Sequence, residues 1–135
     1  MKFPYRKINL KHPFSTKPFI LRPIIPISLR NNNESLRYEA LIDSGADFNI
    51  LPIEIADKLR MHLKTSHKIS FTGIGGNTVN GFKADIVLEI GKEKVQTKTV
   101  FAPVGNGILG QYGFFDNFAV KFDLKNKEIE INSEE

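Results

Sequence analysis

The sequence contains no cysteine and only three histidines among its 135 residues. Without cysteine the chain can form no disulfide, thiolate zinc site or iron–sulfur cluster, and it has no thiol nucleophile. His12, His62 and His67 do not have the spacing of metal ligands, so we expect no metal site. The fold must be held by side-chain packing alone, which is compatible with a cytoplasmic location.

Long hydrophobic runs are also absent. The most apolar early stretch, residues 19–29, is interrupted by Arg22, Pro23 and Pro26 and is too short to span a bilayer. No small-residue cleavage site follows it. We therefore expect a soluble cytoplasmic protein with no membrane partner. A length of 135 residues with 41% hydrophobic and 25% charged residues suits one domain with a real core.

Acidic residues are missing from the first quarter of the chain. Residues 1–33 carry seven Lys or Arg and no acid, whereas residues 34–135 carry 12 basic and 15 acidic groups. We predict a basic N-terminal arm at 1–18 and a folded domain at 19–135. The arm also contains aromatic residues, so a contact with nucleic acid through charge and stacking is an alternative that we do not favour. Four glutamates in the last eight residues would attract the arm wherever the two termini meet.

The pattern of turns and apolar residues is typical of a mostly β protein. The asparagines at 31–33 predict a turn between strands at 25–29 and 36–42, and prolines place the strand within 19–29 at a sheet edge. Residues 52–63 have the apolar spacing of one short amphipathic helix. Further strands are expected at 69–72, 78–90, 94–102 and 108–110, a second short helix or turn at 111–118, and a hairpin of 119–123 with 127–131.

One aspartate stands where an apolar strand ends. Residues 40–42 lead directly into Asp43, followed by Ser44 and Gly45. A carboxylate beside an apolar strand is costly unless it is hydrogen-bonded or shared with another group. Ser44 can donate a hydrogen bond to a neighbouring strand, and Gly45 permits a close backbone approach. A plain Asx turn that caps the strand is the other interpretation.

The order of features along the chain points to a family. The Asp43-Ser44-Gly45 strand, a helix, a glycine-tipped hairpin and an apolar-apolar-Gly strand follow one another between residues 20 and 131. This order resembles the retropepsin-like aspartic proteases. The resemblance implies a retropepsin-like acid protease barrel with one or two short helices. It also implies that Asp43 is catalytic at the base of a cleft, with Ser44 and Gly45 supporting it.

The resemblance also assigns residues that contact a substrate. Gly45 and Asp47 would contact the main chain of an extended peptide. A flap over the peptide would consist of Thr72, Gly73, Ile74, Gly75 and Gly76, and a psi-shaped motif would be completed by Ile108, Leu109 and Gly110. Retroviral members have arginine, a partner for the second aspartate, where this chain has Gln111. The partner of Asp47 is therefore left open.

The expected reaction requires two copies of the chain. Peptide hydrolysis by aspartates uses two carboxylates that share one proton, whereas this chain has one Asp-Ser-Gly and no room for a second lobe. We therefore expect a homodimeric endopeptidase that uses two copies of Asp43 and no cofactor. In this family the termini commonly interleave between subunits; solvated termini are the other interpretation. The alternatives to an enzyme are a catalytically silent dimeric peptide-binding or assembly module of the same fold and a nucleic-acid-associated β-domain.

Overall fold

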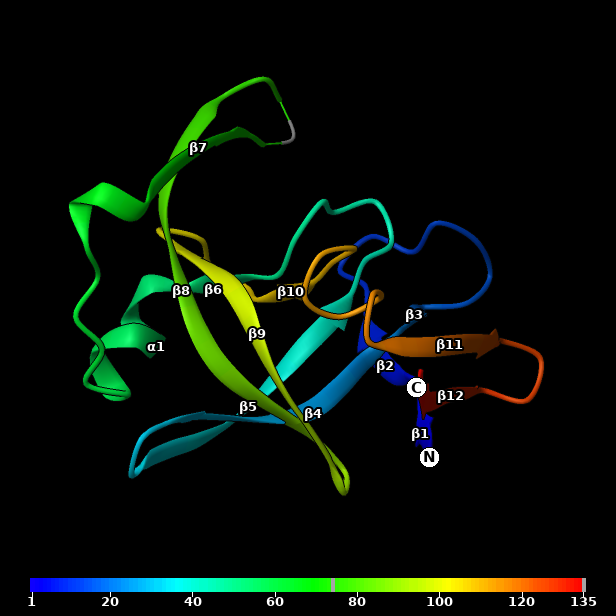
Figure 1. The fold of residues 1–135 in the computed structure, drawn as a ribbon. Helices are drawn as coiled ribbons and strands as arrows, with labels where there is room; N and C mark the ends of the chain where they lie inside the picture. Colours follow the sequence, from blue (N-terminus) through cyan, green and yellow to red (C-terminus); the bar gives the residue numbers. More distant parts are fainter. Residues whose placement is uncertain (74, 135) are drawn as a thin grey trace.

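The computed structural model describes residues 1–73 and 75–134. Within them the chain forms twelve strands, one α-helix and one 3-10 helix (Figure 1). The elements are β1 (Lys2–Pro4), β2 (Arg6–Asn9), β3 (Phe19–Arg22), β4 (Ile24–Asn31), β5 (Glu34–Ile42), β6 (Ile50–Pro52), α1 (Ile53–Lys58), η1 (Thr65–His67), β7 (Lys68–Thr72), β8 (Thr78–Ile90), β9 (Glu93–Ala102), β10 (Ile108–Leu109), β11 (Phe118–Asp123) and β12 (Glu128–Ser133).

The main sheet closes into a barrel. Its strand order is β4-β5-β10-β6-β9-β8-β7, and an additional β4–β8 pairing joins the first strand to the sixth. β7 is left outside the closed ring as an edge strand that pairs with β8 alone. The prediction of a mostly β barrel is therefore confirmed.

Alternation of apolar and polar residues explains the core. On β4 the side chains of Ile25, Ile27 and Leu29 are buried while their neighbours are more exposed, which is the period of two that a strand with one buried face requires. β8 follows the same rule with Ile86, Leu88 and Ile90. Because β4 and β8 pair at Leu29 and Leu88, these two rows meet inside the barrel.

The predicted edge position of the first long strand is only partly right. Pro23 separates β3 from β4, and the later part of β4, Ser28 to Arg30, pairs with β8 as well as with β5. Pro26 lies before that segment, where β4 has β5 as its strand partner. A proline is tolerated there because a missing N–H disrupts no second ladder.

The helix is shorter than the predicted span of 52–63. α1 covers Ile53–Lys58, and Arg60 then adopts a left-handed conformation with φ of 53°. The amide of Met61 donates to the Ala56 carbonyl and the amide of Arg60 to the Asp57 carbonyl, which is the Schellman arrangement that ends a helix. Neither helix in the described part of the chain is long and apolar enough to cross a membrane.

The N-terminal segment forms strands that pair within the same chain. β1 pairs with β12, Lys2 forms an ion pair of 3.7 Å with Glu128, and the Met1 ammonium donates a 3.0 Å hydrogen bond to the Ile131 carbonyl. β2 pairs with β3 in a separate two-stranded sheet. The oppositely charged termini thus meet within one chain and are not merely solvated, and their interleaving between subunits stays a prediction. The proposed boundary at residue 18 stays a prediction.

Candidate active site

Asp43 lies directly after the buried end of β5. There β5 runs parallel to β10, with Leu41 opposite Ile108 and Ile42 opposite Leu109. The Asp43 amide continues this ladder by donating a 2.9 Å hydrogen bond to the Leu109 carbonyl. Since Ile42 and Leu109 are both buried, the core holds the backbone of Asp43 while its side chain remains partly exposed.

A tight turn orients the Asp43 carboxylate. The Gly45 amide donates a 2.9 Å hydrogen bond to Asp43 Oδ1, and the Ala46 amide donates to the Asp43 carbonyl at 3.1 Å. This is the geometry of an Asx turn. Among the described residues, Asp43 Oδ2 has no hydrogen-bond partner, so one oxygen of the carboxylate is free to act on a ligand.

The predicted strand Ile108-Leu109-Gly110 lies beside the Asp43 strand, and Gly110 packs directly under the loop that follows Asp43. A Cβ atom on Gly110 would lie 2.5 Å from the Phe48 carbonyl oxygen and 2.8 Å from that of Ala46. A side chain at this position would therefore displace the loop. Glycine is required here by the close approach of two backbones.

Asn49 is a site-supporting residue that the sequence analysis missed. It is 1% exposed, and its Oδ1 accepts a 2.9 Å hydrogen bond from the Gly110 amide. The signal in the sequence is a lone amide between Phe48 and Ile50 in an otherwise apolar stretch. Such a residue is expected to be buried with its polar atoms satisfied.

Gln111 contacts the Asp43 loop at Ser44. Its Nε2 donates a 2.7 Å hydrogen bond to the Ser44 carbonyl, and its own amide donates to the Ala46 carbonyl at 2.9 Å. The Tyr112 amide donates to the Asp47 carbonyl at 2.8 Å. The side chains of Ser44 and Asp47 are exposed and have no hydrogen-bond or ion-pair partner among residues 1–73 and 75–134.

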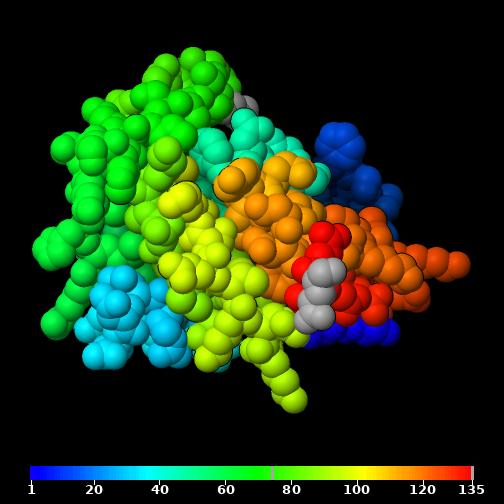
Figure 2. Space-filling model, viewed as in Figure 1, coloured from blue at the N-terminus to red at the C-terminus, as the bar shows by residue number. Residues whose placement is uncertain are grey.

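The glycine-tipped hairpin is the β7–β8 connection. Thr72 pairs with Thr78, the Gly73 amide donates to the Asn77 carbonyl at 2.9 Å, and Gly75 and Gly76 have φ of 96° and 83°. The predicted flap residue Ile74 lies outside the described residues. The hairpin rises above the barrel on the side where the loop after β5 lies (Figure 1). In the space-filling view that loop, coloured teal, reaches the surface between the hairpin and the segment after β10 (Figure 2).

An aromatic contact connects the hairpin to the loop. The rings of Phe48 and Phe71 meet edge to face, with centroids 5.6 Å apart and an interplanar angle of 84°. Next to Phe48 is a hollow of about 480 Å³ whose lining includes Asp47, Ile69 of β7 and Val100 of β9. The structure thus brings Asp47 and the base of the hairpin together around one hollow, while Asp43 lies outside its lining.

No metal-binding cluster is found in the described part of the chain. Residues 1–73 and 75–134 contain no group of three or more His, Asp or Glu side chains that could hold a metal ion. The donors that approach the Asp43 loop are backbone and side-chain amides.

A comparison with models of known protein families shows which family the chain belongs to. A family model described as aspartyl protease matches residues 26–112, which is more than half of the chain. The chain belongs to the aspartyl protease family. The matched range begins in β4 and ends at Tyr112, so it includes the Asp43 loop, the β7–β8 hairpin and Gly110.

A solved structure supports the same fold. The chain of the EIAV protease, solved in complex with the inhibitor HBY-793, matches with a TM-score of 0.56 and 21% sequence identity. The match covers 67% of this chain and 82% of the EIAV protease chain. This likeness confirms the predicted retropepsin-like fold. No curated protein matches the sequence.

Proposed function

We propose that the chain is an aspartic endopeptidase that acts as a homodimer, with Asp43 of each subunit forming the catalytic pair. The observation that carries the proposal is the position of Asp43. It follows a buried strand, its carboxylate is oriented by the Gly45 amide at 2.9 Å, and its second oxygen has no partner among the described residues. In a member of the aspartyl protease family, a carboxylate held in this way suits catalysis.

The chemistry needs a second carboxylate. Two carboxyl groups in close contact cannot both be ionised, because their negative charges repel each other. A pair of Asp43 side chains therefore shares one proton. The ionised aspartate removes a proton from water as the water oxygen attacks the peptide carbonyl carbon, and the protonated aspartate gives its proton to the carbonyl oxygen, which forms a neutral tetrahedral diol. The C–N bond then breaks as one aspartate gives a proton to the leaving nitrogen and the other takes a proton from a hydroxyl of the diol, which releases the amine and the acid and leaves the pair with one shared proton. Since the chain contains one Asp-Ser-Gly sequence, the second carboxylate is supplied by a second copy.

The remaining predicted site residues take supporting roles in this proposal. Gly45 orients the Asp43 carboxylate, and the exposed Ser44 hydroxyl is available to hydrogen-bond across the two-fold axis. Thr72 to Gly76 cover an extended peptide. β7 is an edge strand, so its outer backbone groups can pair with such a peptide.

The dimer contact lies near the Asp43 loops. Within one chain β12 pairs on both sides, with β1 and with β11, whereas β1 and β11 each keep one outer edge that could pair with a second copy. Because the two Asp43 carboxylates must meet at the two-fold axis, we expect the subunits to contact each other through the exposed loop at Ser44 and Gly45 and through the flap turns at Gly75 and Gly76.

The test is cleavage of a broad peptide library, read by mass spectrometry from acidic to neutral pH. We expect the wild type to cleave and Asp43→Asn to lose at least about a thousandfold in rate, because asparagine cannot hold the shared proton. Asp57→Asn, which changes an exposed aspartate on α1, is the matched control and should cleave as the wild type does. Sedimentation velocity on the wild type should show a dimer under the cleavage conditions.

Other outcomes distinguish the alternatives. Turnover by Asp43→Asn equal to that of the wild type would exclude the aspartic mechanism. Peptide binding without cleavage by either protein would favour the catalytically silent module. Salt-dependent binding of a single-stranded oligonucleotide, lost when the exposed Lys11 and Lys17 are changed to glutamine, would favour the nucleic-acid-associated domain.

A further inference from the structure

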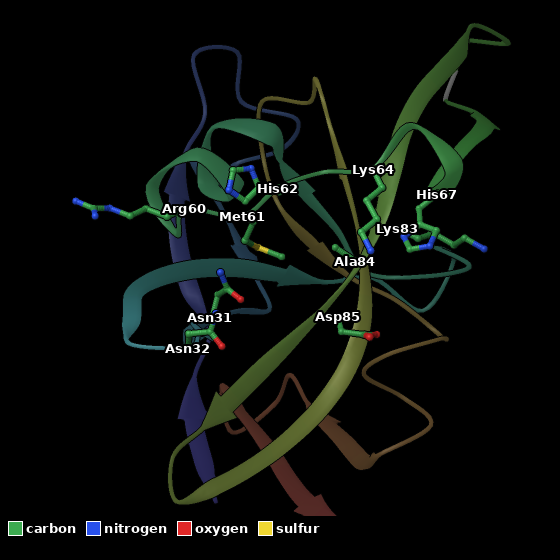
Figure 3. Close-up of a pocket in the computed structure, with 10 residues that line it drawn as sticks. All are labelled: Asn31, Asn32, Arg60, Met61, His62, Lys64, His67, Lys83, Ala84 and Asp85. Carbon is green, nitrogen blue, oxygen red and sulfur yellow. The ribbon is translucent and has the colours of Figure 1, made fainter.

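A strongly basic segment lies outside the site described above. Residues 58–68 contain four Lys or Arg, two His and no acid. The segment runs from the end of α1 through η1 to the start of β7. With the β4–β5 turn and the middle of β8 it lines a hollow of about 280 Å³ (Figure 3).

The positive charge at this hollow is not neutralised by its neighbours. Lys64 and Lys83 line it and form no ion pair with any described residue. Asp85 lines it too, but its Oδ1 is already 2.8 Å from Lys98 Nζ. In Figure 3 the Lys64 side chain extends toward β8, whereas Arg60 points away from the hollow; the Arg60 Nε lies 3.6 Å from Glu34 Oε1.

Lys83 connects this hollow to the candidate active site. The same side chain also lines the hollow beside Asp47 and Phe48, together with Lys98. Lys83 and Asp85 lie on the exposed face of β8, and Lys98 lies opposite Asp85 on β9. A basic strip, defined here as Lys64, His67 and Lys83, therefore leads from the hollow next to Asp47 toward the end of α1.

We propose that the basic strip binds an acidic segment of the polypeptide substrate, next to the part of the substrate that occupies the cleft. The inference rests on the proposed endopeptidase function and adds the substrate class, a protein with Asp or Glu residues flanking the cleaved bond. Lysine ammonium groups on flexible stems suit carboxylates that vary in position, because they act as point charges rather than as rigid forks.

The lining of the hollow favours an acidic peptide over a nucleic acid. It contains no Phe, Tyr or Trp, and its ring side chains are the small imidazoles of His62 and His67, so it offers single-stranded bases little surface on which to stack. The segment also follows the C-terminal end of α1, so no helix N-terminus contributes backbone amides to anion binding at this hollow. Attraction must therefore come from the side-chain charges.

The first experiment compares two peptides that share one core cleaved in the library screen. One carries a short run of glutamates on its flank and the other a matched run of serines. At low ionic strength the wild type should show a higher kcat/KM for the glutamate peptide, and Lys64→Glu should reduce the glutamate-to-serine ratio by about three- to tenfold. Lys125→Glu, which changes an exposed lysine in the β11–β12 turn, is the matched control and should keep the wild-type ratio.

A binding measurement separates this proposal from the proposed function. Fluorescence anisotropy measures the affinity of the inactive Asp43→Asn protein for a labelled octapeptide of alternating valine and glutamate. We expect this affinity to be about three- to tenfold weaker in the double variant Asp43→Asn, Lys64→Glu. The affinity should also fall as salt is added.

The outcomes separate the two proposals. If the wild type cleaves peptides but Lys64→Glu changes neither the glutamate-to-serine ratio of kcat/KM nor the affinity for the acidic peptide, the basic strip does not bind the substrate. If binding depends on Lys64 but nothing is cleaved, the strip stands and the endopeptidase fails. An oligo-dT strand that displaces the acidic peptide and binds more tightly would overturn the choice of partner.

Discussion

Asn49 and Gly110 are joined by a 2.9 Å hydrogen bond from the Gly110 amide to Asn49 Oδ1, at a point where both residues are buried. The bond ties the loop that follows Asp43 to the end of β10. The preceding residue, Leu109, accepts the amide hydrogen of Asp43, so these two hydrogen bonds together hold both sides of the candidate catalytic loop. The side-chain amide of Asn49 thus stabilises the position of the candidate catalytic loop.

Removing this side-chain amide should destabilise the fold. In Asn49→Ala the buried Gly110 amide loses its acceptor, so we expect the free energy of unfolding to fall by about 1–3 kcal/mol. Urea denaturation followed by circular dichroism measures this change. Asn132→Ala removes an exposed amide from β12 and should stay within about 0.5 kcal/mol of the wild type. Equal losses in the two variants would contradict a bracing role for Asn49.

Gly110 should not tolerate a methyl group. Its Cβ would lie 2.5 Å from the Phe48 carbonyl oxygen, so Gly110→Ala must push the Asp43 loop away from β10. We expect a loss of about 1–3 kcal/mol in urea denaturation and a greater relative loss of peptide cleavage. The control is Gly105→Ala, since no atom lies within 4 Å of a Cβ at that position. A stable, fully active Gly110→Ala protein would show that the two backbones can separate without consequence.

The edge-to-face contact between Phe48 and Phe71 should hold the base of the β7–β8 hairpin. Phe71→Leu keeps an apolar side chain but removes the ring contact at 5.6 Å, with an expected cost of about 1 kcal/mol. Hydrogen exchange of the β7 amides should become faster by up to about fivefold, because local opening needs less free energy. Phe122→Leu, on the exposed face of β11, provides the comparison. Unchanged exchange in β7 would mean that β8 pairing alone holds the hairpin.

The β11–β12 turn should respond to pH through Asp123. The Asn126 side chain and its backbone amide donate hydrogen bonds of 2.8 Å and 3.1 Å to the carboxylate, and they hold the pKa of Asp123 below its ordinary value. Since the pKa is lowered in the folded state, the stabilisation is present at neutral pH and is lost as the pH falls through the folded-state pKa.

NMR titration of the Asp123 carboxyl carbon measures this effect. Asn126→Ala removes the larger of the two influences, so the pKa of Asp123 should move up toward its ordinary value. Lys125→Ala changes the same turn without touching either hydrogen bond and should leave the lowered pKa of Asp123 in place. A pKa of Asp123 that stays equally low in Asn126→Ala would assign the shift to the backbone amide of residue 126 and to the neighbouring lysines instead.

Local signals in the sequence predicted most elements of the barrel. β8 occupies Thr78–Ile90, as expected, because its apolar residues alternate and glycines bound it at both ends. The turn at Asn32, with φ of 52°, joins β4 to β5 at the predicted place, since asparagine tolerates that conformation. The family membership followed from the same kind of signal, the Asp43-Ser44-Gly45 turn and the downstream glycines.

Conformations without a local signature were harder to predict. α1 ends at Lys58 because Arg60 turns left-handed, although nothing in the residue type of an arginine predicts a positive φ. The basic N-terminal residues contain no clear period, and they become strands only because β12 and β3 supply hydrogen-bond partners.

The sequence by itself determined most strands of the barrel, the turns between them and the aspartate at the end of a buried strand, because period and turn chemistry are properties of neighbouring residues. Only the tertiary structure decided that Asn49 braces Gly110, that Gln111 contacts Ser44, and that Lys83 joins two hollows. The residues that meet at these places are far apart in the sequence or lie on different strands. Their proximity follows from how the barrel closes, and barrel closure depends on the packing of the whole core rather than on any one segment.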